Sequence, residues 1–217
     1  DGSGKITRRG DASKIDRAEV ESALEGFRGS IRQTPPMYSA VKHQGKPLYT
    51  LARAGIEVKR KSRTVKIHRL ELIAWKSPVA TVEVECGKGT YIRSLANDLG
   101  QSLGCGAHLK SLVRTRCGLF DIKDAVTMSG LEEAFLYGYW EHFIYPIDIV
   151  LQDYNAVVVD DAAEEAIKNG SAVALGQDGK GDSRQKYCRA YAVDGRFLGI
   201  LRHIPDKGIW QPKKVLV

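Results

Sequence analysis

The 217-residue sequence predicts an α+β protein with one main core and a small β-rich C-terminal domain. Three observations support this prediction. Apolar residues recur at helical spacing near residues 13–27 and again after Thr90, and two strand-like segments lie between them. From Pro146 onward the pattern changes to short strands and turns. A hydrophobic content of 43% over this length suits one good-sized core or a core with a small second domain.

The N-terminal part contains a helix followed by an irregular stretch. Residues 13–27 carry an apolar face, Asp16 and Glu19 have the spacing of a capping box, and Gly29 is expected to stop the helix. Thr34-Pro35-Pro36 then resists regular structure, so residues 36–49 are predicted to form a loop before a short helix at 48–54. A connection of this length inside a domain is unusual unless it is functional.

Two strands and a helix follow. Apolar residues alternate over 65–74, with a slip near His68 that predicts a β-bulge, and alternate again over 82–86 after a turn at Ser77-Pro78. Gly87-Lys88-Gly89 ends the second strand, and Thr90 is the expected N-cap of the next helix. The buried stripe of that helix is predicted to be Ile92, Leu95, Ala96, Leu99 and Leu103, before Gly104 and Gly106 end it.

The remaining elements define the predicted domain boundary. A strand is expected at 108–117, a helix at 131–140, a strand at 156–159 and a helix at 161–168 that stops at Asn169-Gly170. Two or three strands are expected over 186–217, with a hairpin turn at Asp194-Gly195. We therefore predict domains at 1–145 and 146–217.

The net charge of +7 is concentrated in one segment. Residues 31–63 contain eight basic residues and one acidic residue, Glu57, and the rest of the chain is formally neutral. Such a cluster is the electrostatic footprint of a polyanion-binding element, although a solvated loop would look the same. The basic residues are Arg32, Lys42, Lys46, Arg53, Lys59, Arg60, Lys61 and Arg63.

Several classes of protein are disfavoured. No run of about 18 apolar residues predicts a membrane span, and residues 1–5 do not resemble a secretory signal. The four cysteines lack the spacing of a zinc site or a disulfide scaffold; they are Cys86, Cys105, Cys117 and Cys188. We therefore expect four reduced, mostly buried thiols in a protein of a reducing compartment. The five histidines form no metal-binding pattern. Nucleotide-binding, hydrolase and zinc-protease motifs are missing from the sequence. Asp98, Asp121 and Asp124 could be nominated as catalytic acids, but solvated or capping carboxylates are the simpler interpretation.

The strongest local signal is Gly87-Lys88-Gly89-Thr90-Tyr91-Ile92-Arg93. Arg93 falls in a first helical turn, where its charge opposes the positive end of the helix dipole, which suggests a carboxylate or phosphate partner. Tyr91 could stack on a base or donate a hydrogen bond. An exposed arginine and a core tyrosine remain the alternatives.

Two further segments carry weaker signals. Residues 35–42, Pro-Pro-Met-Tyr-Ser-Ala-Val-Lys, place an aromatic ring, a hydroxyl and a lysine among basic residues, a combination that suits RNA loops; a mobile surface loop is the alternative. Residues 104–116 join small residues to an apolar and basic stretch. On their own they indicate an ordinary connection from helix to strand.

Taken together, these segments resemble the TruB family of tRNA pseudouridine synthases. The motifs are in order and correctly spaced over residues 1–128, and the tail is similar in outline to the small PUA-like C-terminal domain of bacterial members. The motifs that carry the resemblance are Phe27-Arg28-Gly29, residues 35–42, Gly45-Lys46-Pro47-Leu48-Tyr49, residues 52–58, residues 88–95, Asp98-Leu99-Gly100 and residues 103–109.

The resemblance implies a mixed α/β pseudouridine-synthase domain built on an antiparallel sheet. It implies isomerisation of the T-loop uridine of tRNA, position 55, to pseudouridine, with the target base flipped out of its stack and without a metal or organic cofactor. A catalytic aspartate attacks, and the base detaches, rotates and rejoins through carbon. The expected partner is the T-stem-loop of tRNA, with no membrane association, in a cytoplasmic and monomeric protein.

Residue roles follow from the resemblance position by position. Arg93 matches the arginine that pairs with the catalytic aspartate, Tyr91 matches a tyrosine that contacts the target nucleotide, and Leu112 matches an apolar residue of the uridine pocket. Residues 34–63 match the thumb loop that grips the T-stem-loop. Its expected RNA contacts are Tyr38, Lys42, Lys46, Tyr49 and Arg53.

One departure affects the expected activity. The family's aspartate lies in a Gly-x-Leu-Asp-Pro-like motif that this sequence lacks, and residues 1–4 resemble a polar turn that follows it. The chain is therefore expected to supply the RNA-binding thumb and part of the active site, and to be inactive by itself. A non-catalytic RNA-binding or tRNA-folding protein is the alternative, and an unrelated β-rich module whose basic loop contacts ribosomal RNA is a third.

Overall fold

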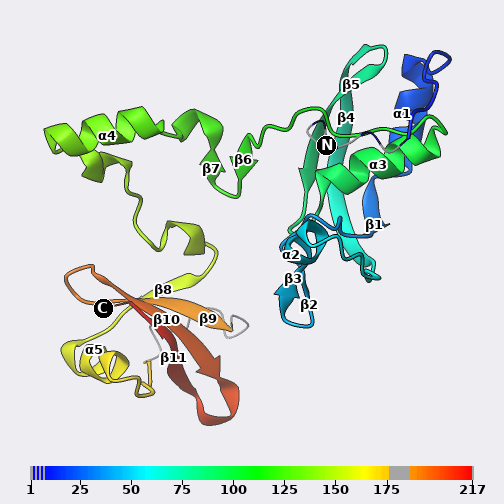
Figure 1. Ribbon diagram of the computed structural model, residues 1–217. Coiled ribbons are helices and arrows are strands. Elements are labelled where there is room, and N and C mark those ends of the chain that lie inside the picture. Colours follow the sequence, from blue (N-terminus) through cyan, green and yellow to red (C-terminus); the bar gives the residue numbers. More distant parts are fainter. Residues whose placement is uncertain (1, 3, 5, 7, 176–185, 217) are drawn as a thin grey trace. The chain divides into compact units, whose positions relative to one another are not determined.

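The computed structural model describes residues 2, 4, 6, 8–175 and 186–216 (Figure 1). The chain divides into two compact units, Asp1–Val113 and Arg114–Val217. The boundary predicted after residue 145 falls inside the second unit and stays a prediction. The polar turn expected at residues 1–4 lies partly outside the described residues.

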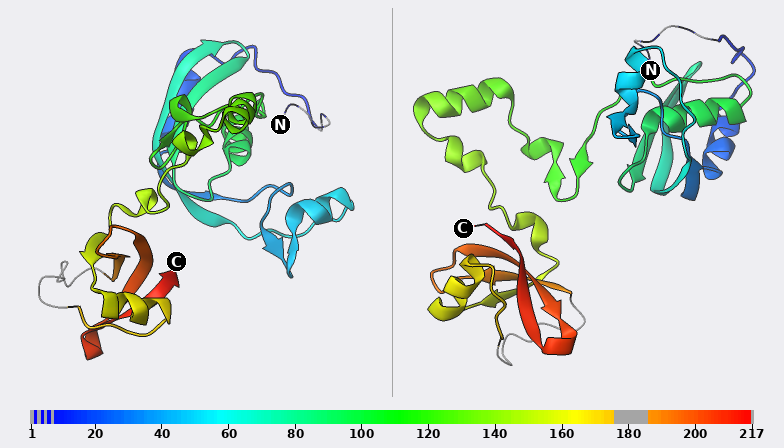
Figure 2. Two further views of the ribbon diagram at one scale, coloured as in Figure 1. Left: turned by 90° about the vertical axis from the view of Figure 1, so that its left-hand side faces the viewer. Right: turned by 60° about the horizontal axis from the view of Figure 1, so that its bottom comes forward.

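The first unit is built on an antiparallel sheet, as predicted. Its three strands are β1 (Gly29–Gln33), β4 (Arg63–Lys76) and β5 (Val79–Cys86), in the order β1-β4-β5 (Figure 2). The register shifts between Ile67 and Arg69, which confirms the bulge predicted near His68. Strand β1 was not predicted because its five residues contain one apolar side chain and show no alternation.

Two helices cover this sheet and form one core with it. Helix α1 (Arg17–Glu25) begins at Asp16, and the predicted capping box between Asp16 and Glu19 is confirmed. The helix ends before Gly26, three residues earlier than the predicted stop. Helix α3 (Ile92–Ser102) supplies the second layer of side chains. The buried members of this core are Val20, Leu24, Ile67, Leu70, Leu95 and Leu99.

The start of α3 differs from the prediction. The N-cap is Tyr91, not Thr90, and it makes no side-chain capping bond. The Thr90 hydroxyl instead donates to the Gly87 carbonyl at 2.8 Å. This bond closes the glycine turn, in which Gly89 has a φ of +81°. The hydroxyl therefore stabilises the turn and leaves the helix N-terminus without a side-chain cap.

The strand predicted at 108–117 is wrong except at its end. Only Arg116–Cys117 (β6) is a strand, paired with Phe120–Asp121 (β7). Residues 107–115 have no regular secondary structure, and most of their side chains are exposed. A strand requires a neighbouring backbone with which to exchange hydrogen bonds, and periodicity alone does not reveal whether that neighbour exists.

The second unit combines a helical segment with a mixed sheet. Helix α4 (Met128–Tyr137) is capped by Thr127 and by Gly138, so the helix predicted at 131–140 is present but starts earlier. Single 3₁₀ turns occur at Ile122–Asp124, Trp140–Phe143 and Ile149–Leu151. The sheet has the order β11-β10-β9-β8, with β8 (Asn155–Val158), β9 (Tyr187–Tyr191), β10 (Phe197–Ile204) and β11 (Ile209–Val215).

This sheet has its own buried core. Strands β8 and β9 are parallel and the other pairs are antiparallel, while α5 (Asp161–Lys168) is found where the sequence predicted it. The three C-terminal strands and the turn around Asp194-Gly195 are also confirmed. The core residues are Val159, Ile167, Val173, Cys188, Ala190, Ala192, Leu198, Leu201 and Trp210.

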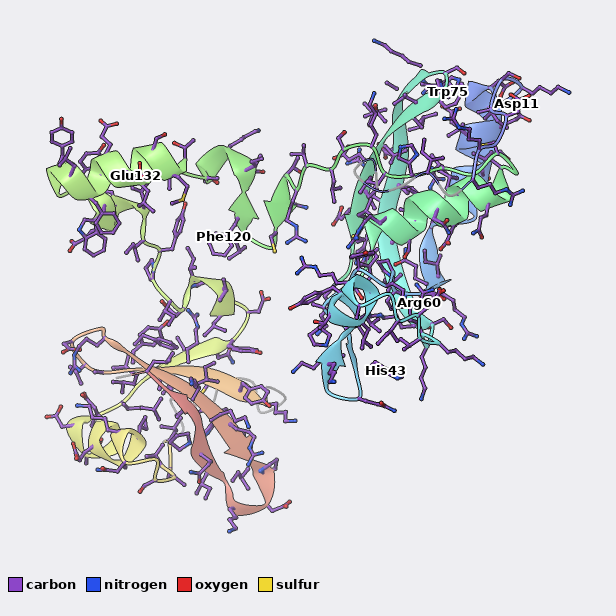
Figure 3. The ribbon with its side chains drawn as sticks, in the orientation of Figure 1. Asp11, His43, Arg60, Trp75, Phe120 and Glu132 are labelled. Carbon is purple, nitrogen blue, oxygen red and sulfur yellow. The ribbon has the colours of Figure 1, made fainter. Side chains whose placement is uncertain are left out.

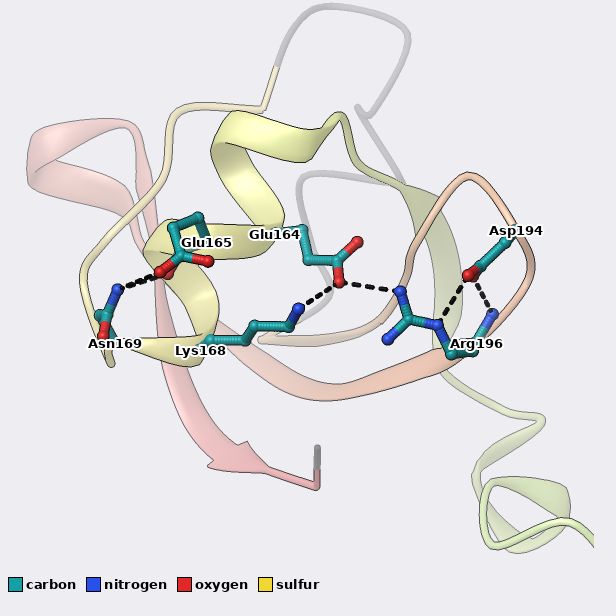
Figure 4. A network of polar contacts seen from close by, with 6 residues as sticks. All are labelled: Glu164, Glu165, Lys168, Asn169, Asp194 and Arg196. Atoms are coloured by element: carbon teal, nitrogen blue, oxygen red, sulfur yellow. Dashed lines mark hydrogen bonds and ion pairs between the residues drawn. The ribbon is translucent and has the colours of Figure 1, made fainter.

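A polar network ties α5 to the turn between β9 and β10 (Figure 4). The carboxylate of Glu164 accepts from Lys168 at 2.6 Å and from Arg196 at 3.0 Å. Arg196 also donates to Asp194 at 2.7 Å. The hydrogen bond from Lys168 is the main cause that lowers the pKa of Glu164, and the bond from Arg196 lowers the pKa of Asp194.

All four cysteines are free thiols, but the expectation that they are mostly buried is wrong. Cys188 is buried, and burial raises its pKa to about 12, whereas Cys117 is exposed. No helix in the described ranges is long and apolar enough to cross a membrane. Within the same ranges, no group of three or more His, Cys, Asp or Glu side chains is placed to hold a metal ion.

A glycine in α3 leads to a test of the fold. A Cβ on Gly100 would lie 2.0 Å from the backbone nitrogen of Ala107, so the chain after the helix requires a glycine here. Gly100→Ala should lower the free energy of unfolding by about 1–3 kcal/mol despite the better helix propensity of alanine. Urea unfolding measures this change. Gln101→Ala, at the exposed neighbouring position, is the control and should change the free energy by less than about 0.5 kcal/mol.

Candidate RNA-binding and catalytic site

The thumb, residues 34–63, contains more structure than the predicted loop. A short hairpin pairs β2 (Lys42–His43) with β3 (Lys46–Pro47), and α2 (Leu48–Arg53) follows directly (Figure 3). Gln44 and Gly45 both have positive φ, the geometry of a tight hairpin turn. The predicted short helix is confirmed, and the loop predicted over 36–49 is corrected because Lys42–Pro47 forms this hairpin.

Backbone hydrogen bonds and one buried side chain hold the thumb together. The Leu48 amide donates to the Val41 carbonyl at 2.8 Å, and the Tyr49 amide donates to the Ser39 carbonyl at 3.1 Å. The Leu48 side chain is 2% exposed and anchors α2. These contacts join α2 to the segment before the hairpin. A shallow cavity of about 200 Å³ lies on the thumb itself, lined by Met37, Tyr38, Ala52, Gly55, Ile56 and Glu57.

The predicted RNA contacts are all exposed on this thumb. Lys42 and Lys46 lie on the two short strands, and Tyr38 is 56% exposed. The Arg53 guanidinium lies 5.5 Å from the centre of the Tyr49 ring, so α2 presents a cation and an aromatic ring together. Cations beside exposed rings can pair with phosphates and stack on unpaired bases.

Tyr91 and Arg93 lie at the start of α3, and the structure connects Arg93 to the thumb. The Arg93 Nη2 atom donates to the backbone carbonyl of Tyr38 at 2.7 Å. Among the described residues, Arg93 forms no ion pair with a carboxylate. A neutral carbonyl thus partly offsets its unfavourable place in the first helical turn.

A buried amide joins the end of β1 to the same helix start. Gln33 is 1% exposed; its Oε1 accepts from the Tyr91 amide at 2.9 Å, and its Nε2 donates to the Tyr91 carbonyl at 3.1 Å. One residue further on, the Thr34 carbonyl accepts from the buried hydroxyl of Ser94 at 2.9 Å. The root of the thumb and the first turn of α3 are therefore held as one piece.

The Tyr91 ring has a basic neighbour. The Arg63 guanidinium lies 5.5 Å from the ring centre, within the range of a cation–π contact. Arg63 and Gln33 are directly opposite each other in the β1–β4 register. The Arg63 Nη2 atom is buried, and no described residue accepts a hydrogen bond from it.

The other predicted site residues have different surroundings. Leu112 is 61% exposed on a segment without regular secondary structure, and its place in a uridine pocket stays a prediction. The Asp121 carboxylate caps the first 3₁₀ turn by accepting from the Lys123 amide at 2.9 Å, and Asp98 accepts from Asn97 at 3.1 Å. The capping interpretation of Asp121 is therefore confirmed.

Sequence reasoning missed Gln33 and Ser94 and did not single out Arg63. Gln33 precedes the two prolines in a short strand, and nothing in its neighbourhood indicates that its amide is buried. Arg63 was one of eight clustered basic residues, and its contact with Tyr91 depends on strand register. Neither contact leaves a periodic signal in the sequence.

Comparison with known proteins identifies the family. A model of the TruB family pseudouridylate synthase N-terminal domain matches residues 1–92, and a model of the tRNA pseudouridylate synthase B C-terminal domain matches residues 93–152. The chain is 39% identical over 217 residues to tRNA pseudouridine synthase B of Dehalococcoides mccartyi, with all of this chain and 71% of that protein covered. It is 42% identical over 205 residues to the protein of the same name from Nitrosospira multiformis, with 93% of this chain and 64% of that protein covered.

Solved structures share the fold. The crystal structure of a Cbf5-Nop10-Gar1 complex superposes with a TM-score of 0.69 at 24% identity, covering 94% of this chain and 63% of that one. A structure of an H/ACA RNP bound to a substrate RNA containing 2'-deoxyuridine gives a TM-score of 0.68 at 18% identity, covering 96% of this chain and 63% of that one. The chain thus spans less than two thirds of these solved chains.

The fold, the thumb joined to the start of α3, and identities of about 40% over all or nearly all of the chain lead to one assignment. This chain belongs to the TruB family of pseudouridylate synthases.

Proposed function

We propose that this protein isomerises a uridine of tRNA to pseudouridine, and that its target is the T-loop uridine at position 55. One observation carries the proposal. The Arg93 hydrogen bond to the Tyr38 carbonyl joins the exposed thumb to the start of α3, so RNA gripped by the thumb is held next to Tyr91 and Arg93. The names of the relatives, tRNA pseudouridine synthase B, support the substrate class.

The proposed chemistry exchanges one bond of the nucleoside for another. The bond from the ribose to the base nitrogen breaks, the base rotates, and the ribose is joined to a base carbon. That carbon loses its proton and the released nitrogen gains one, so no atom is gained or lost overall. The attacking group is the catalytic aspartate of the family motif, which the 217 residues do not contain, and Arg93 is the cation proposed to pair with it. Tyr91 contacts the flipped nucleotide, and Leu112 lines the apolar side of the uridine pocket.

The thumb supplies most of the proposed RNA affinity. Lys42, Lys46 and Arg53 are exposed and can neutralise phosphates, while Tyr38 and Tyr49 offer rings to unpaired bases of the T-stem-loop. Residues 146–217 contain ten acidic and ten basic residues, which does not favour a large phosphate contact there. We propose that they form a PUA-like domain, and that the protein acts in the cytoplasm as a monomer without a metal or organic cofactor.

The thumb contribution can be tested by removing its cations. The triple variant with Lys42, Lys46 and Arg53 changed to alanine should bind tRNA more weakly, and the slope of log K against log salt should fall by up to about 3. Fluorescence anisotropy at several salt concentrations measures both quantities. The matched control changes the exposed Lys207, Lys213 and Lys214 of the second unit, which removes the same charge. Equal effects in the two variants would contradict a specific role for the thumb.

We also propose that the 217-residue chain binds tRNA without converting it, because the sequence contains no Gly-x-Leu-Asp-Pro-like motif. Incubation of the purified chain with T-stem-loop RNA should leave the uridine unchanged in a carbodiimide-based pseudouridine assay. A TruB-family enzyme that carries the motif is the positive control. Conversion by the chain alone would show that the proposed attacking residue has been misassigned.

Arg93 can be tested in an active enzyme that combines this chain with the family's aspartate motif. Arg93→Ala and Arg93→Lys should lower kcat by about 10²–10³-fold, because the proposed pairing needs a planar guanidinium against a carboxylate. The affinity for tRNA should fall much less than kcat, since the proposed phosphate contacts of the thumb remain and only its hydrogen bond to Arg93 is altered. Single-turnover kinetics with separate binding titrations distinguish the two effects. A variant with normal kcat and weakened binding would instead place Arg93 on the RNA backbone.

A further inference from the structure

Two residues that face each other across the sheet both contact Tyr91. Gln33 is the last residue of β1, Arg63 is the first residue of β4, and the two are paired in the antiparallel register. Gln33 binds the Tyr91 backbone, and Arg63 lies against the Tyr91 ring. The end of the sheet therefore contacts Tyr91 twice, once at its backbone and once at its ring.

The Gln33 contact can be made only by a group with both a donor and an acceptor. Its Oε1 accepts from the Tyr91 amide, while its Nε2 donates to the Tyr91 carbonyl, at 2.9 and 3.1 Å. The side chain is 1% exposed, so water cannot replace either bond if the amide is lost. Tyr91 is the N-cap of α3 and makes no side-chain capping bond. The two bonds from Gln33 therefore hold its backbone in place.

The Arg63 contact fixes the ring instead. Its guanidinium lies 5.5 Å from the ring centre, and its Nη2 atom is buried without a hydrogen-bond acceptor among the described residues. Arg63 as a whole is half-buried, and its guanidinium contacts the Tyr91 ring.

We propose that Gln33 and Arg63 are positioning residues for Tyr91, holding its backbone and its ring in place before RNA binds. The inference rests on the proposed function, in which Tyr91 contacts the target nucleotide. A tyrosine held in place before RNA binds loses less conformational entropy on reaching the transition state. A small displacement of such a group therefore lowers kcat more than it weakens RNA binding. Neither residue is required to touch the RNA.

The Gln33 test uses an active enzyme that combines this chain with the family's aspartate motif, and it measures kcat, KM and tRNA affinity separately. Gln33→Leu removes both hydrogen bonds and should lower kcat by about 10–100-fold, with tRNA affinity within about twofold of wild type. Gln33→Glu provides a second readout. A protonated carboxyl has a donor and an acceptor, whereas the carboxylate only accepts and would repel the Tyr91 carbonyl.

The expected pH dependence has a defined sign. Burial disfavours the charged form and raises the pKa of an introduced glutamate, so Gln33→Glu should recover activity relative to wild type as the pH falls from about 8 to about 5.5. Gln33→Leu should show no such recovery. Melting temperatures over the same pH range establish that each variant stays folded at the assay temperature.

The Arg63 variants complete the test and remain informative if the Gln33 variants do not fold. Arg63→Met should lower kcat while the tRNA affinity is retained. Arg63→Lys should lower kcat less, because lysine keeps the positive charge but lacks the planar guanidinium group. Lys76→Ala, an exposed change at the other end of β4, should match wild type in both quantities.

The outcomes separate this inference from the proposed function. If the wild-type protein forms no pseudouridine, the proposed function fails. If it forms pseudouridine while Gln33→Leu and Gln33→Glu keep its kcat and pH profile, Gln33 does not position Tyr91. If Arg63→Met weakens tRNA binding with kcat unchanged, Arg63 binds RNA phosphate and its positioning role is overturned.

Discussion

The paired hydrogen bonds between the buried Gln33 amide and the backbone of Tyr91 are the constraint on which the site depends. They join the end of β1 to the start of α3, two segments that are 58 residues apart in sequence. The bond from Ser94 to the Thr34 carbonyl extends this junction by one residue. Because the thumb begins at Thr34, its root is fixed to the helix that carries Tyr91 and Arg93.

A separate contact with the thumb partly offsets an electrostatic conflict in α3. Arg93 is a cation in a first helical turn and would be unfavourable there without a partner. The Tyr38 carbonyl, on the thumb, accepts its hydrogen bond at 2.7 Å. The residue proposed to act in catalysis is therefore in direct contact with the element proposed to bind RNA. Any movement of the thumb that displaces this carbonyl would free the Arg93 guanidinium for another partner.

The second unit is stabilised by different means. Strands β8 and β9 run parallel, which requires a long crossover, and α5 lies within that connection. Asp148, before β8, accepts from the Tyr191 hydroxyl, and Arg189 donates to Tyr191 and to the Tyr154 carbonyl. Burial is the main cause that raises the pKa of Tyr191, followed by the bond to Asp148. These polar contacts tie the segment before β8 to the sheet.

The sequence by itself determined the α+β class, the family and the charged thumb, because periodicity, capping residues and motif spacing are local properties. It located the bulge near His68, the limits of α5 and the aromatic and basic residues of the thumb for the same reason. Only the tertiary structure decided that residues 108–115 lack a strand partner, that Thr90 closes a turn, and that Gln33 and Arg63 meet at Tyr91. Those facts depend on strand register and on contacts between residues tens of positions apart, which leave no periodic trace in the chain.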